Sequence, residues 1–334
     1  MSLAVSEFGD YLGVQGLDFI SKNGKGELRN RVPIYQAKQI LLTPKGYVST
    51  RALLFAAVYG INTLVLSHSG KPLSVLVPLS QLANGELKQF EFCRNPRGIE
   101  MAKKIVEAKL QRQKALLDSL YGSKQRTEYH AEALEKCMRL LKAVDSRDNK
   151  GARKQLLGVE SFYGEFYFQS LRPFFNRKLA TGARIGRGAY DPMNNMLNLG
   201  YAVLESEALK AILSAMLDPS IGVLHTSHSS KFSLALDLME PYRTIVDKFV
   251  LRFSERLGLR DFQLRFGRFF LTQDLTIEFL FQLDREFDSF LGDSRTRGRS
   301  QRFRVRTAIQ DEAVKFAHAV EGKGRENEKI TVSS

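Results

Sequence analysis

The sequence predicts an α+β fold, in which a β-rich, sandwich-like N-terminal domain precedes a larger all-α domain. Two observations predict it. The first ninety residues hold short apolar or alternating runs separated by proline and glycine turns, as strands do. From about residue 96, apolar residues recur every three to four positions over long stretches, as they do in helices. The 334 residues, 43% of them apolar, suit two domains with buried cores.

Turn and capping residues delimit the N-terminal elements. Pro44 and Gly46 follow a partly alternating run, and Ser49 or Thr50 is expected to cap a short helix that Gly60 ends. The expected elements are strands at 35–43, 62–67 and 72–78, turns at 44–47 and 69–71, and a helix over 51–60.

The remaining chain is expected to be helical. A long helix over 98–121 has one apolar stripe, and its opposite face carries Lys103, Lys104, Lys109, Arg112 and Lys114. Further helical patterns cover 128–144, 152–180, 193–217 and 233–257. The predicted organisation is an N-terminal domain at 1–90, a linker within 79–95, a helical domain at 96–320 and a flexible tail at 321–334.

The chain is strongly basic, since 50 Lys and Arg against 36 Asp and Glu give a net charge of +14. This excess favours polyanionic partners, nucleic acid first and an anionic membrane surface second. A basic protein with no such partner is the remaining alternative. Composition excludes a mostly disordered chain, a collagen-like fibre and a disulfide scaffold. An intracellular protein is expected, because no apolar run could span a bilayer, the N-terminus lacks a signal-peptide pattern, and Cys93 and Cys137 lack metal-ligand spacing.

A run of arginines near the C-terminus has two interpretations. Charge runs are usually solvated loops. A strap that contacts phosphates is the alternative, favoured by the basic chain and by Phe303 and Val305, which interrupt the run. The residues are Arg295, Arg297, Arg299, Arg302, Arg304 and Arg306.

Common motifs for nucleophilic catalysis and nucleotide binding are missing from the sequence. It holds no GxSxG, P-loop, HExxH or CxxC pattern. The glycines at 182–188 lack the spacing and preceding strand of a dinucleotide site, so they indicate a flexible loop that presents Arg184 and Arg187.

Histidine and acidic residues gather between 222 and 243. His225 and His228 lie in a loop rich in glycine and serine, and Asp237 and Glu240 follow on one face of a helix among leucines. Glu160 lies in a separate apolar and aromatic stretch. Imidazole and carboxylates without a thiolate suit Mn²⁺ or Mg²⁺ better than structural zinc.

The alternative to a metal site is a set of structural contacts. Spacing alone leaves both open. In this alternative Asp237 and Glu240 pair with Lys231 and Arg243, Glu160 pairs with Arg153 or Lys154, and His225 is an ordinary loop histidine.

These segments resemble, in order, the CRISPR-associated DNA integrase and endonuclease family that acts in spacer acquisition. GVESFYG at 158–164 is similar to the family's glutamate motif, and DPMNNMLNLGYAVL at 191–204 to its DPxNxxLxxGYxxL signature. IGVLH and SLALDLMEPYR are similar to its histidine and acidic motifs. The resemblance runs from about residue 10 to 320, and Ser161 departs from the glycine that commonly follows the glutamate.

The resemblance implies a divalent metal ion, Mn²⁺ or Mg²⁺, bound by Glu160, His225 and Glu240. Asp237 is expected close by as a further catalytic residue, and it or His228 is a candidate to take or relay a proton. Candidates for DNA contact are Arg184, Arg187 and Arg243 for phosphates, with Tyr163 or Tyr167 for stacking on a base, for which core packing is the alternative.

The implied activity is the insertion of short DNA fragments as new spacers into a CRISPR array, by attack of a 3′-hydroxyl on a phosphodiester. The implied partners are double-stranded DNA (the incoming fragment and the CRISPR repeat), a second copy that forms a homodimer, and a small companion adaptation protein that bridges two dimers. No membrane is involved, and the expected location is the prokaryotic cytoplasm, at the nucleoid during action. The alternatives are a non-catalytic DNA-binding scaffold and a transposon-type nuclease or integrase outside CRISPR immunity.

Overall fold

The computed structural model describes residues 2–5, 7–68, 70–76, 85–180, 182–186, 188–225, 232–288, 290–296 and 299–322. The chain divides into two compact units. The first comprises Met1–Phe90, Leu209–Pro219 and Ala313–Ser334, and the second comprises Glu91–Ala208 and Ser220–Glu312. Strands gather in the first unit and helices dominate the second, so the predicted α+β fold class is confirmed. Among the described helices, none is long and apolar enough to cross a membrane.

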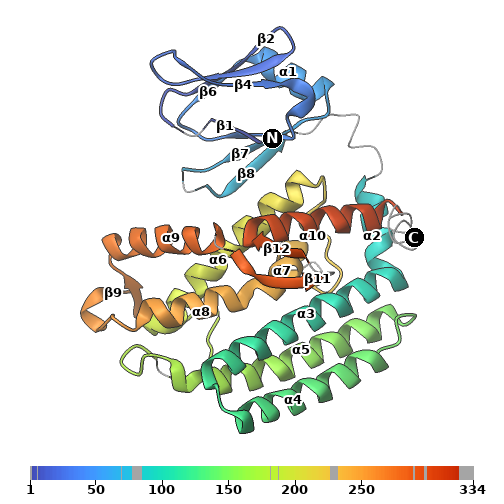
Figure 1. Ribbon diagram of the computed structural model, residues 1–334, viewed down its shortest axis with the longest axis vertical. Helices are drawn as coiled ribbons and strands as arrows, with labels where there is room; N and C mark the ends of the chain where they lie inside the picture. Colours follow the sequence, from blue (N-terminus) through green and yellow to red (C-terminus); the bar gives the residue numbers. More distant parts are fainter. Residues whose placement is uncertain are drawn as a thin grey trace. The chain divides into compact units, whose positions relative to one another are not determined.

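Two four-stranded sheets form the N-terminal part of the first unit (Figure 1). In one, β1 (Ser2–Val5), β5 (Gln39–Leu42) and β7 (Asn62–Leu66) run parallel, and β8 (Pro72–Leu76) pairs antiparallel with β7. The other has the order β4 (Leu28–Pro33), β3 (Asp18–Lys22), β2 (Tyr11–Gln15), β6 (Tyr47–Val48). The strand expected from residue 35 begins only at Gln39, because Ile34–Gln36 form a 3₁₀ turn.

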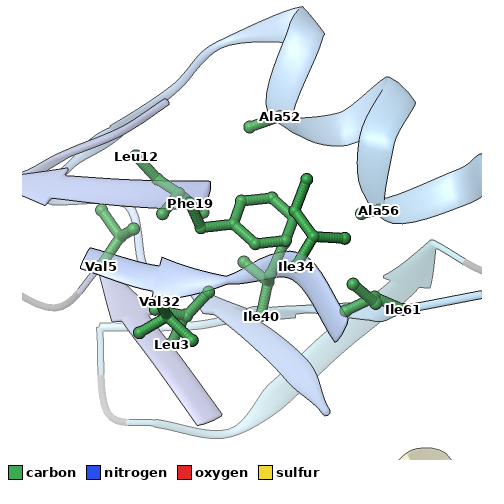
Figure 2. Packing of buried hydrophobic residues seen from close by; sticks show 10 residues of the cluster. All are labelled: Leu3, Val5, Leu12, Phe19, Val32, Ile34, Ile40, Ala52, Ala56 and Ile61. Carbon is green, nitrogen blue, oxygen red and sulfur yellow. The ribbon is translucent and has the colours of Figure 1, made fainter. Parts of the chain in front are cut away.

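The predicted N-terminal helix is present as α1 (Thr50–Val58). The hydroxyl of Ser49 accepts the backbone N–H of Ala52 at 3.1 Å, which caps the helix. Figure 2 shows the ring of Phe19 between the strands and this helix, where the small side chains of Ala52 and Ala56 let the helix approach. The core of this part comprises Leu3, Val5, Leu12, Phe19, Val32, Ile34, Ile40, Ala52, Ala56 and Ile61.

Long helices build the second unit. Helices α3 (Pro96–Tyr121), α4 (Lys124–Ala143) and α5 (Asn149–Leu171) lie side by side (Figure 1), and α3 packs on both of the others. Asn95 caps α3 by accepting the N–H groups of Arg97 and Gly98, and Gly122 ends it with a left-handed φ of 64°. The other helices are α2 (Gly85–Arg94), α6 (Pro192–Ser214), α7 (Ser233–Met239), α8 (Arg243–Ser254), α9 (Gln273–Asp288) and α10 (Val305–Val320), of which α2, α6 and α10 extend across the division between the units.

The helix expected over 233–257 is interrupted. Glu240–Tyr242 form a single 3₁₀ turn between α7 and α8. Pro241 lies in this turn, and proline cannot donate the backbone hydrogen bond that a continuous α-helix requires.

Two small hairpins were not expected in the helical part. One pairs β9 (Phe262–Arg265) with β10 (Arg268–Leu271), and the other pairs β11 (Phe290–Thr296) with β12 (Arg299–Arg304). The second hairpin takes up most of the arginine run, so of the two interpretations the plain loop does not hold, and the strap on phosphates stays a prediction. Arg306 forms ion pairs with Glu207 at 3.0 Å, with Asp288 at 2.9 Å and with Asp284. The side chains of Arg295, Arg297, Arg299 and Arg302 lie outside the described residues.

Candidate metal centre

Glu160, His225 and Glu240 converge in the second unit. Glu160 lies on α5, His225 in the segment before α7, and Glu240 at the start of the 3₁₀ turn. One ligand atom from each residue lies within 4.8 Å of the other two. Two carboxylates and one imidazole are a donor set that Mn²⁺ or Mg²⁺ accepts. The fold thus brings together the three residues that the resemblance implies as metal ligands.

Asp237 is fully buried and holds the backbone that carries His225. Its Oδ2 accepts the N–H groups of Val223 and Leu224 at 2.7 and 3.0 Å, and its Oδ1 accepts that of His225 at 3.0 Å. Gly222 is required beside it, because a Cβ there would lie 2.6 Å from Oδ2. These contacts engage both oxygens of Asp237, so this buried carboxylate fixes the backbone of residues 223–225.

Asp237 also sets the orientation of the imidazole. Nδ1 of His225 lies 2.7 Å from Oδ1 of Asp237, which leaves Nε2 free to act as the ligand atom. Burial lowers the pKa of His225, but the hydrogen bond and charge of Asp237, with the charges of Glu160 and Glu240, raise it above its usual value. The proton-relay role considered for Asp237 stays a prediction; in the structure its contacts are with His225 and the neighbouring backbone. The other candidate for that role, His228, lies outside the described residues.

A lysine bridges the two glutamates. Nζ of Lys109, on α3, lies 2.5 Å from Oε1 of Glu160 and 2.6 Å from Oε2 of Glu240. Its side chain is only 11% exposed. The sequence placed Lys109 on the polar face of a helix; in the structure α5 and the 3₁₀ turn pack on α3, and Lys109 is covered while Lys104 stays exposed. Burial lowers the pKa of Lys109, but the charges of Glu240 and Glu160 raise it above its usual value.

Arg243 forms a second ion pair with Glu240. Its Nε donates to Oε2 at 2.9 Å and its terminal nitrogen lies 2.8 Å from Oε1, a bidentate pair. Burial raises the pKa of Glu240, but Arg243 and Lys109 lower it to well below its usual value. Glu240 thus engages the guanidinium of Arg243, and the predicted contact of Arg243 with a phosphate stays a prediction. The pairing of Glu240 with Arg243 is the one foreseen in the structural alternative.

Arg153 supports the segment of His225 instead of pairing with Glu160. Its Nε donates to the carbonyl of Val223 at 2.8 Å, and its terminal nitrogen donates to the carbonyl of Cys93. Arg153 therefore ties α5 to the backbone at Val223 and at Cys93.

A buried network lies behind Arg243. Its guanidinium carbon lies 4.6 Å from the centre of the Tyr201 ring, and the Tyr201 hydroxyl donates to Asp247. The Tyr167 hydroxyl donates to the same carboxylate at 2.7 Å. Burial raises the pKa of Asp247, although both hydroxyls lower it. The sequence analysis did not identify Asp247 and Tyr201 as members of a buried network, because within a helical pattern nothing distinguishes them from other helix residues.

A cavity of about 640 Å³ opens beside Glu160, and its lining includes Lys109, Arg172 and Arg184 together with Glu165 and Phe168. Arg184 is held there by Oδ1 of Asn194 at 3.1 Å and of Asn198 at 2.6 Å. Arg184 thus lies where a phosphate near Glu160 could reach it. The other predicted DNA contacts differ: Arg187 lies outside the described residues, and Tyr163 and Tyr167 are fully buried in the core and offer no ring face to a base.

Comparison with known proteins agrees with the resemblance found in the sequence. The family model described as CRISPR associated protein Cas1 matches residues 3–285. The chain is 32% identical over 270 residues to CRISPR-associated endonuclease Cas1 1 of Archaeoglobus fulgidus, covering 75% of this chain and 77% of that protein. It is 30% identical over 259 residues to CRISPR-associated endonuclease Cas1 1 of Francisella tularensis subsp. novicida, covering 76% and 79%.

Solved structures share the fold. A casposase bound to integration product superimposes with a TM-score of 0.76 at 23% identity, covering 96% of both chains. A Cas1 protein from Thermotoga maritima gives 0.72 at 19% identity, covering 97% of both. The family match spans most of the sequence and includes the segments that carry Glu160, His225 and Glu240. The chain belongs to the Cas1 family of CRISPR-associated proteins.

Proposed function

We propose that this chain is a divalent-metal-dependent DNA endonuclease and integrase, which inserts short DNA fragments as new spacers into a CRISPR array by 3′-hydroxyl transesterification. The observation that carries the proposal is the convergence of Glu160, His225 and Glu240 from three separate segments. Family membership supports it, since the relatives from Archaeoglobus and Francisella are named as endonucleases. The substrate makes the prokaryotic cytoplasm, at the nucleoid, the proposed place of action.

In the proposed centre, Glu160, Glu240 and Nε2 of His225 hold one Mn²⁺ or Mg²⁺ ion. When bound, the ion would act as a Lewis acid that stabilises negative charge on the reacting phosphate. Asp237 keeps the imidazole oriented through Nδ1, and Arg243 keeps Glu240 in place. Neither residue needs to contact DNA for these roles.

In the proposed reaction, the 3′-oxygen of the incoming strand forms a bond to phosphorus in the CRISPR repeat. The bond between that phosphorus and the 3′-oxygen of the repeat strand breaks, the attacking hydroxyl loses its proton, and the departing oxygen gains one. The cavity beside Glu160 suits the strand end, because Arg172 and Arg184 can pair with phosphates and Phe168 offers an apolar face. Water in place of the hydroxyl would give cleavage at the same site.

We also propose that the N-terminal domain at 1–90 forms a homodimer and that the dimer works with a small companion adaptation protein. The first unit exposes large apolar side chains at Phe8, Tyr35 and Tyr47, with exposures of 88%, 82% and 68%. One solved neighbour is a complex in which Cas1 and Cas2 occur together. Light scattering should give a dimer mass for the wild type and a smaller mass after replacement of all three residues by serine. Phe266→Ser, in the other unit, is the control.

Strand transfer tests the main proposal. Supercoiled plasmid carrying a CRISPR repeat and a short duplex with free 3′ ends are incubated with Mn²⁺, Mg²⁺ or chelator, with and without the companion protein. Glu160→Ala and His225→Ala should each abolish joining while the fold is retained, and Glu132→Gln, an exposed position on α4, should join as the wild type does.

The other outcomes point to the alternatives. Tight binding without joining or cutting under any metal would show a DNA-binding scaffold. Joining to any plasmid, with no preference for the repeat, would favour a transposon-type integrase. Full activity in Glu160→Ala would remove the proposed centre.

A further inference from the structure

The ammonium of Lys109 lies between the two carboxylates that the proposed centre needs. It contacts Oε1 of Glu160 at 2.5 Å and Oε2 of Glu240 at 2.6 Å. Glu240 has a second cation, since Arg243 binds both of its oxygens. Among the described residues, Lys109 is the cation that contacts Glu160. Without Lys109, Glu160 would face Glu240 without this ion pair.

We propose that Lys109 is the resident counter-cation of the metal-free centre, which holds Glu160 and Glu240 together and which a divalent ion must displace from their shared space. This inference rests on the proposed metal site, but it concerns the binding of metal and not the reaction.

The first argument is the arrangement of charge. A buried ammonium is retained only where paired carboxylates offset the loss of its water, and here both partners are metal-ligand candidates. Removing it would leave two carboxylates with ligand atoms within 4.8 Å of each other. Lys109 therefore stabilises the arrangement of ligands before any metal arrives.

The second argument is competition for the same oxygens. A divalent ion binding Glu160 and Glu240 with His225 has to share the space into which Nζ of Lys109 now points, and two cations at that distance repel each other. The butylene chain of lysine gives the ammonium freedom to withdraw, whereas the bidentate guanidinium of Arg243 stays on Glu240. The cavity beside Glu160, which Lys109 also lines, is where the ammonium can move.

Lys109→Met tests the proposal, because it keeps an unbranched side chain only one atom shorter and removes the charge. Calorimetric titration with MnCl₂ should show about tenfold tighter binding than the wild type. Thermal unfolding of the metal-free protein should shift to lower temperature, and Glu160→Gln added to Lys109→Met should restore much of that loss. Lys104→Met, on the exposed face of the same helix, should change neither quantity.

Opposite results overturn the inference. Weaker Mn²⁺ binding in Lys109→Met would show that the lysine organises the site for metal, and unchanged binding would show that it does not compete. If Lys109→Met unfolds without metal, it should fold when prepared with Mn²⁺, since the ion supplies the missing charge; a variant that is unfolded in both conditions overturns the proposal. A wild type that binds no Mn²⁺ or Mg²⁺ at all would instead remove the proposed function.

Discussion

Oδ1 of Asp237 lies 2.7 Å from Nδ1 of His225 and also accepts the backbone N–H of the same residue. With Oδ2 bound to the N–H groups of Val223 and Leu224, one buried carboxylate fixes both the imidazole and the backbone that carries it. A carboxylate of this kind hydrogen-bonds the ring nitrogen of a metal-binding histidine that does not contact the metal. Its replacement commonly lowers the metal affinity by 10- to 100-fold.

Asp237→Asn should therefore weaken Mn²⁺ binding by about 10- to 100-fold without removing any ligand atom. The amide NH₂ would face N–H donors, so the free energy of unfolding should also fall by about 1–3 kcal/mol. Calorimetry and urea unfolding measure the two effects. Glu132→Gln, at an exposed position within α4, is the control and should change neither. Wild-type metal affinity in Asp237→Asn would show that the orientation of His225 does not depend on this contact.

Tyr201→Phe isolates the buried network behind Arg243. The ring that faces the guanidinium stays, while Asp247 loses one of its two hydroxyl donors, so the free energy of unfolding should fall by about 1–3 kcal/mol. Tyr190→Phe, at an exposed position, is the matched control.

The pH dependence of this deficit has a defined sign. Burial raises the pKa of Asp247 above its usual 3.8, so the folded state favours the protonated acid, and this stability is lost as pH rises through the folded-state pKa. The missing hydroxyl matters most for the ionised form, so the deficit of Tyr201→Phe should grow as pH rises through the folded-state pKa of Asp247. Urea unfolding over a pH series measures it, and a deficit that shrinks as pH rises would contradict hydrogen bonding of the Tyr201 hydroxyl to an ionised Asp247.

Local signals in the sequence were sufficient where one segment determines its own structure. Ser49 and Gly60 delimited α1, and the apolar period delimited α3. The burial of Lys109 was not predicted, because helical period alone cannot show that two other segments of the chain cover this residue. Asp237 and Glu240 looked equivalent for the same reason: only the folded chain shows that one faces backbone donors and the other faces Lys109 and Arg243.

The β9–β10 hairpin could not be read from alternation. Its turn, Phe266–Gly267, has two positive φ angles of 49° and 73°, and phenylalanine rarely takes this conformation. The more common signal for such a turn is Asn-Gly or Asp-Gly. The neighbouring arginines also resemble a solvated basic loop, so the charge pattern gave no indication that β9 and β10 pair.

The two cysteines should be unreactive in the folded protein. Burial, with a smaller contribution from the charge of Asp237, raises the pKa of Cys93 to about 12, and burial also raises the pKa of Cys137. At pH 8 only about one Cys93 in ten thousand would be a thiolate, the form that reacts. A disulfide reagent at pH 8 should find no reactive thiol in the native protein and two after denaturation. Rapid reaction of one thiol in the native state would contradict the packing around Cys93 or Cys137.

Arg172 and Arg306 represent two kinds of arginine: one that is free to contact DNA and one that stabilises the fold. Arg172 is exposed and lines the cavity beside Glu160, and no ion pair engages it within the described part of the chain. Arg172→Gln should weaken binding to a short duplex and reduce the slope of log K against log salt by about one, because one phosphate contact is lost.

Arg306→Gln should behave differently, because Glu207, Asp284 and Asp288 already occupy this guanidinium. Its removal leaves the largely buried Glu207 without this partner, so the free energy of unfolding should fall by about 1–3 kcal/mol. The salt slope of DNA binding should stay at the wild-type value. Fluorescence anisotropy over a salt series, together with urea unfolding, measures both quantities for both variants. A salt slope that falls in Arg306→Gln would mean that this arginine leaves its acidic partners for phosphate, and that the end of the arginine run does act as a strap on DNA.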